Sequence, residues 1–170
     1  MKKFLSLLMV LSFILTISSC SKDDPNMPAT VTSNKAYEIT FLVGATQGTN
    51  ASATMNLSDF TELGAYVKNV YKVELLNSSE LTITGITAGG HVLKDAKLTL
   101  DGTKTVRNLT TLTADKTTTN SEDIDFLKQV ANRIVSNKNA GVTFSISESA
   151  KDVNRTIPVK IKMDVIFHLR

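Results

Sequence analysis

The chain has 170 residues, of which 42% are hydrophobic and 21% are charged, with one cysteine and no tryptophan. A single cysteine excludes an intrachain disulfide. The 19 basic and 16 acidic residues give a net charge of only +3, and no basic stretch is interleaved with aromatic residues. Nucleic acid is therefore excluded as an expected partner.

The first 19 residues have the layout of a secretory signal peptide. Lys2 and Lys3 are followed by the apolar run 4–17 and then by two serines. As a helix this run would be about 21 Å long, which is shorter than the roughly 30 Å hydrocarbon core of a bilayer. A cleaved signal is therefore favoured over a transmembrane anchor, and its removal lowers the net charge to +1.

The cysteine follows this segment directly, in the sequence Ile17-Ser18-Ser19-Cys20. These four residues resemble a bacterial lipobox. The resemblance implies that the signal is removed before Cys20 and that the cysteine sulfur is acylated, with palmitate as an expected chain. Each buried methylene contributes about 0.8 kcal/mol, so two or more chains would hold the protein firmly at a membrane. The alternative is an ordinary signal peptide with an incidental cysteine.

The residues after the cysteine carry a second resemblance. Lys22, Asp23 and Asp24 are similar to the lysine-plus-two-acids export signal of Bacteroidota lipoproteins that reach the outer face of the outer membrane. Over residues 1–24 this resemblance implies an outer-membrane lipoprotein that faces the exterior. The alternative is that these three charges only keep a linker solvated.

The chain is therefore expected to have three parts: a signal peptide over 1–19, the acylated Cys20 with a flexible linker over 20–35, and one β-rich domain over 36–170. Pro25, Pro28 and the polar composition of the linker are typical of an unstructured tether. The remaining domain is long enough to bury about two-thirds of its unfolded surface.

The clearest predicted strand covers residues 156–169, where apolar side chains occupy every odd position from Ile157 to Leu169. Pro158 lacks an N–H, so we expect the beginning of this strand to lie at a sheet edge or outside the ladder. Similar or weaker patterns predict further strands over 37–43, 51–57, 69–76, 80–86, 96–101, 105–112 and 142–146.

Two segments have the signature of helices. A capping-box pattern at Asp59 and Glu62 predicts a short helix that ends near residue 67. Apolar residues spaced three and four apart predict an amphipathic helix over 121–136. Many strands with one firm helix favour an antiparallel β-sandwich of immunoglobulin-like or jelly-roll kind, and the alternative is a lipocalin-like β-barrel.

The sequence predicts no catalytic, cofactor or metal site, and so no enzyme. His91 and His168 are far apart and lack ligand spacing, which favours structural or surface roles. Glu122, Asp123 and Asp125 could be read as calcium ligands, but their position at a helix start without a glycine-centred loop favours helix capping.

Three functions remain open at this stage. The first is a surface-displayed binding or adhesion module with a glycan or protein partner, attached to the membrane through the lipid on Cys20. The second is a fimbria-like subunit whose C-terminal strand takes part in assembly. The third is a carrier of an apolar small molecule.

Overall fold

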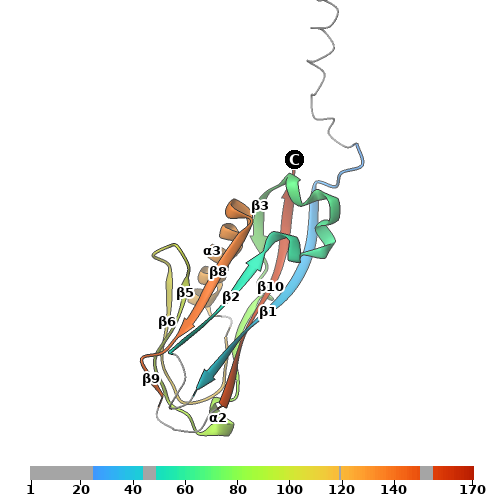
Figure 1. Ribbon diagram of the computed structural model, residues 1–170. Helices are drawn as coiled ribbons and strands as arrows, with labels where there is room; N and C mark the ends of the chain where they lie inside the picture. The colour runs from blue at the N-terminus through green and yellow to red at the C-terminus, as the bar shows by residue number, and fades with distance from the viewer. Residues whose placement is uncertain (1–24, 44–48, 119, 150–154) are drawn as a thin grey trace, which may run out of the picture.

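The computed structural model describes residues 25–43, 49–118, 120–149 and 155–170. It consists of two antiparallel five-stranded sheets, with a long helix that contacts strands of both (Figure 1). The first sheet contains β1 (Thr30–Val43), β3 (Val70–Leu75), β4 (Glu80–Ile83), β7 (Lys116–Thr118) and β10 (Arg155–Leu169). The second sheet contains β2 (Asn50–Asn56), β5 (Leu93–Leu100), β6 (Val106–Leu112), β8 (Asn139–Ser145) and β9 (Glu148–Ser149).

The strand pairing is nested from the two ends of the domain inward. β1 pairs with β10, β2 with β8, β4 with β7 and β5 with β6, all antiparallel. This is the pattern of a long hairpin rolled over on itself, which distributes the pairs between two sheets as a jelly roll. The prediction of an antiparallel sandwich is confirmed. The barrel alternative is wrong, because the described strands form two separate sheets that do not close on each other.

The last strand, β10, is the centre of the first sheet. It pairs with β1 along one side and with β3 and β4 along the other. All of its odd-numbered residues from Ile157 to Leu169 are buried, as the alternation predicted. The expectation for Pro158 holds on one side of the strand: Pro158 pairs with Thr40 of β1, but the ladder with β4 begins only at Val159, so the start of β10 is an edge on that side. The Pro158 carbonyl accepts from Thr84 just beyond the end of β4, so the missing N–H falls where that neighbour has already ended.

The predicted helix is confirmed as α3 (Ser121–Asn137). Its apolar residues at the predicted spacing are buried, and the helix packs against β3 of the first sheet and β8 of the second. Asn120 is the N-cap, and its side-chain oxygen accepts from the N–H of Asp123 at 2.9 Å. The helix therefore packs its buried face against strands of both sheets.

Two local predictions needed correction. β1 begins at Thr30, inside the segment expected to be a flexible linker, because backbone pairing with β10 orders it without an apolar pattern. The helix expected at Asp59 is instead a pair of 3₁₀ helices, η1 (Leu57–Asp59) and η2 (Thr61–Asn69). Asp59 is the third residue of η1, and its Oδ2 accepts from the N–H of the N-cap residue Asn56 at 2.8 Å.

The interior at the helix end is filled by side chains. The space between α3 and the first sheet has no room for a water molecule, and it is lined by Phe60, Val73, Ala131, Ile134, Val165 and Phe167. Phe60 and Phe167 meet there edge to face, with ring centroids 5.0 Å apart. Within the described ranges, every helix is too short or too polar to cross a membrane.

Candidate functional site

The residues singled out from the sequence lie outside the described part of the chain. Cys20, the predicted acylation site, and Lys22, Asp23 and Asp24, the predicted export signal, all precede residue 25. These predictions remain predictions. The described domain begins a few residues later, and its start lies beside the end of β10, where Ala29 accepts from the N–H of Leu169 at 3.0 Å.

The two histidines occupy different environments. His91 is buried after the short helix α2 (Ile86–Gly89), whereas His168 lies on the outer face of the first sheet. Its Nε2 is 3.0 Å from Oε1 of Glu74. Among the described residues, no group of three or more histidine, cysteine, aspartate or glutamate side chains is arranged to hold a metal ion.

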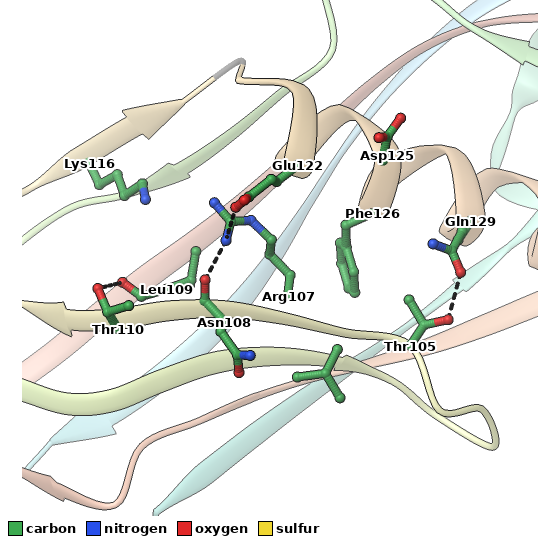
Figure 2. A pocket seen from close by; sticks show the side chains of 11 residues that line it. Thr105, Arg107, Asn108, Leu109, Thr110, Lys116, Glu122, Asp125, Phe126 and Gln129 are labelled. Atoms are coloured by element: carbon green, nitrogen blue, oxygen red, sulfur yellow. Dashed lines mark hydrogen bonds and ion pairs between the residues drawn. The ribbon is translucent and has the colours of Figure 1, made fainter.

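An open groove runs between β6 and the first half of α3 (Figure 2). We call it the β6–α3 groove, and its volume is about 570 Å³. One wall is the continuous stretch 105–110, and Lys116 of β7 lies at one end. The other wall consists of four helical residues, Glu122, Asp125, Phe126 and Gln129.

Arg107 fastens the two walls together. Its Nε donates to Oδ1 of Asp123 at 2.6 Å, and its Nη1 lies 2.7 Å from Oε2 of Glu122. The Asp123 side chain is fully buried and that of Arg107 is 11% exposed, so water screens this ion pair only weakly. Nη1 also donates to the backbone carbonyl of Asn108 (Figure 2). Two acidic residues at the helix start, Glu122 and Asp123, thus anchor the helix to a strand.

A second bridge ties the other end of the groove. The hydroxyl of Thr105 donates to Oε1 of Gln129 at 2.6 Å (Figure 2). Between the two bridges Phe126 is buried, whereas Val106 is 45% exposed beside the opening. The strand wall is therefore held at a set spacing from the helix while its outer edge stays accessible.

The strand wall changes direction at Thr110. This β-branched residue has φ of 62°, and Asp95 on β5 has φ of 51°. Both values lie in the left-handed region, which costs a β-branched residue more than most. The β5–β6 register shifts on both sides of the Ala96–Thr110 pair, so each strand contains a bulge here. The paired bulges lie at the Thr110 end of the strand wall.

A second groove of about 480 Å³ lies between β3 and the end of α3. Three of its lining residues, Lys68, Lys72 and Arg170, are basic. The Arg170 guanidinium lies 4.9 Å above the ring of Tyr71, a residue that is 46% exposed. This groove is at the end of the domain where β1 begins and β10 ends.

The sequence reasoning missed the β6–α3 groove. It assigned the acidic residues to the helix start and the strand 105–112 to the sheet, but it did not bring Arg107 to Asp123. The available signal was Arg107, the one basic residue within the otherwise uncharged predicted strand 105–112. A charged side chain at an inward-facing strand position is costly to bury unless it is paired with an opposite charge.

The strand order and the groove define the class: a jelly-roll domain with an open strand edge beside a helix. No family model matches the chain. No curated protein sequence matches it. Among solved structures, the crystal structure of the decameric BFDV capsid protein aligns with a TM-score of 0.41 and 12% identity, covering 82% of this chain and 99% of that one.

Proposed function

We propose that this chain is an outer-membrane lipoprotein that faces the exterior and acts as a non-catalytic binding or adhesion module. The observation that carries the binding role is the β6–α3 groove, an open strand edge held beside a helix face by a buried ion pair. A groove built in this way presents hydrogen-bonding groups at a set spacing, which suits recognition of a macromolecular partner.

The anchoring part of the proposal rests on Cys20 and on Lys22, Asp23 and Asp24. β1 begins at Thr30, so the tether from the acylated cysteine can reach at most about 35 Å. β6 lies at the edge of the second sheet opposite β2, and β2 is the strand that packs beside β1 (Figure 1). The groove is therefore on the side of the domain away from the strand that carries the tether.

The other two functions receive less support. Donation of the C-terminal strand would require β10 to leave three neighbouring strands and a buried face. A carrier of an apolar molecule needs an apolar cavity, whereas the groove is lined by four charged side chains and two amides.

The anchor is tested by replacing Cys20 with Ala and fractionating cells. We expect the variant protein to leave the membrane fraction and to remain folded by circular dichroism. Persistent membrane attachment would overturn the lipoprotein part of the proposal. Cys20 precedes the described residues, so circular dichroism of the variant is compared with that of the parent as the control for folding.

The binding role is tested with two tryptophan variants of one helix. Gln129→Trp places a large ring in the groove, whereas Lys128→Trp places the same ring on an exposed position that does not line it. Cells carrying each variant are compared for retention of glycans, host proteins and outer-membrane proteins. Loss with Gln129→Trp alone supports the groove, and equal retention by both variants excludes it as the contact site.

A further inference from the structure

We infer that the β6–α3 groove takes an extended peptide segment of a partner protein, which adds to β6 as one more strand of the second sheet. This inference rests on the proposed function, because it assigns the chemistry of the partner to the same groove. It is carried by the direction of the β6 backbone groups, by the face that α3 presents, and by the balance of charge around them.

The backbone of β6 exposes a regular set of hydrogen-bonding groups on its open side. Leu100 of β5 donates its N–H to the carbonyl of Thr105, so the backbone carbonyl of Thr105 points toward β5. The backbone N–H and C=O groups of successive residues point to opposite sides of a strand. Those of Arg107 therefore also point toward β5, and those of Val106 and Asn108 point away from it. Arg107 confirms this orientation, since its side chain reaches the carbonyl of Asn108 on the groove side.

In the described part of the chain, β6 has β5 as its only strand partner. Exposed edges of this kind invite pairing with other chains, and proteins commonly protect them with charge or by covering them. Here the Arg107 guanidinium covers one carbonyl, that of Asn108, while the groups of Val106 remain turned to the groove. The open edge of β6 is thus covered by Arg107 at the Asn108 carbonyl and left accessible at Val106.

The helix provides a floor for an added strand. Glu122, Asp125, Phe126 and Gln129 are spaced at i, i+3, i+4 and i+7, so they share one face of α3. The strand wall 105–110 spans about 17 Å at the usual rise of a β-strand. A peptide beside it would direct every second side chain toward this helix face, which is the geometry of strand addition between a sheet edge and a helix.

The charged residues that line the groove restrict the net charge of the peptide that can bind there. The groove lining contains two basic residues, Arg107 and Lys116, and two acidic residues, Glu122 and Asp125. This balance gives no net attraction for phosphate or for a strongly charged peptide. The groove therefore suits the backbone of a peptide segment that is uncharged or carries mixed polar side chains. A folded second copy fits less well, because its own β6 edge is bordered by its own α3.

The experiment uses the full chain, purified in detergent, and a phage-displayed library of random linear peptides as the probe. An enriched peptide is synthesised, and a second version is made with alternate backbone nitrogens methylated. We expect the first to bind and the second to bind at least about tenfold more weakly, because methylation removes the hydrogen bonds of an added strand. NMR-detected hydrogen exchange should show slowed exchange at the amides of Val106 and Asn108.

Two pairs of variants keep the result interpretable. Val106→Pro removes an outward N–H from the groove edge, and Thr54→Pro removes an outward N–H from β2, which has β8 as its described strand partner. Gln129→Trp fills the groove without changing either strand, and Lys128→Trp places the same ring outside the groove as its control. We expect Val106→Pro and Gln129→Trp to weaken peptide binding about tenfold and the two controls to leave it unchanged.

Several outcomes would overturn the inference: a library that yields no peptide, peptides that bind equally to Val106→Pro, or protection at amides outside β6. Dimerisation through β6, seen by sedimentation and lost in Val106→Pro, would assign the edge to a second copy instead. Retention of a glycan that is lost in Gln129→Trp would refute the peptide while leaving the proposed binding role intact. Failure of both peptide and surface-retention assays would remove the proposed function itself.

Discussion

The guanidinium of Arg107 and the carboxylate of Asp123 form a buried ion pair between β6 and α3, with Nε 2.6 Å from Oδ1. The two residues come from different elements, and their contact holds the helix to the edge of the second sheet. Removing one member of such a pair leaves an uncompensated charge in the interior, which is more costly than removing both.

We therefore predict that Arg107→Met lowers the free energy of unfolding by about 3–5 kcal/mol, measured by urea denaturation. The double variant with Asp123→Asn should recover most of this loss, because no buried charge remains. Lys128→Met removes an exposed pair with Asp125 on the same helix and should cost less than about 1 kcal/mol. Equal losses for Arg107→Met and Lys128→Met would contradict the buried role.

Tyr37 should make the domain less stable in alkali. Burial raises the pKa of its phenol, and the Asp59 carboxylate adds to this increase. Above a pH of about 10 the unfolded chain releases this proton while the folded chain retains it, so the free energy of unfolding falls as pH rises. Tyr37→Phe keeps the ring contact with Phe60 and removes the titration.

The comparison for Tyr37→Phe is a series of denaturation curves at increasing pH. The difference in stability between the variant and the parent should be constant from neutral pH to about 9 and should then shift in favour of the variant. A constant difference through pH 11 would show that this phenol does not control the alkaline decline.

Glu62 should have the opposite dependence, in acid. The buried Ser33 hydroxyl donates to Oε2 of Glu62 and lowers the pKa of that carboxyl below its ordinary value. A lowered folded pKa gives stability that is present above the unfolded value and is lost as pH falls through the folded value. In Ser33→Ala the pKa of Glu62 should rise toward the ordinary value, as an NMR titration of the carboxyl would measure. An unchanged titration would exclude this hydrogen bond as the cause.

Deleting the last ten residues should unfold the whole domain. These residues include the odd-numbered positions of β10 from Ile161 to Leu169, all of them buried, and they pair with three other strands. Deleting Arg170 alone is the control. Loss of near-ultraviolet circular dichroism is expected only for the longer deletion. A folded monomer that fails only to assemble would instead support donation of this strand to a neighbouring subunit.

Replacing Asp23 and Asp24 together with Ala tests the export signal. We expect the protein to remain in the outer-membrane fraction but to become resistant to protease added to intact cells, because the acylated Cys20 is unchanged. The variant pair Glu38→Ala and Glu74→Ala is the control, since it removes two acidic residues whose half-exposed side chains make only surface ion pairs in the folded domain. Unchanged surface exposure after the Asp23 and Asp24 replacements would favour a simple solvated linker.

Local patterns were sufficient for several elements. The alternation from Ile157 to Leu169 predicted the buried face of β10, and the three- and four-residue spacing predicted α3 nearly to its ends. Each of these features depends on residues close together in the chain, so the sequence shows it directly.

Pairing between distant segments was decided only by the tertiary structure. β1 starts at Thr30 because β10 lies beside it, and Pro158 is tolerated inside the ladder because β4 ends next to it. Periodicity could not choose between immunoglobulin-like and jelly-roll forms, since every half-buried strand has the same alternation whichever neighbour it joins. The nested order became visible only with the registers.

The sequence by itself determined a β-rich domain with one amphipathic helix behind a segment that resembles a lipoprotein signal. The tertiary structure alone decided which strand edge stays open, that Arg107 meets Asp123, and that the helix lies beside β6. The physical reason is range: side-chain periodicity is set by immediate neighbours, whereas a groove forms where two elements distant in the sequence pack and leave an edge between them.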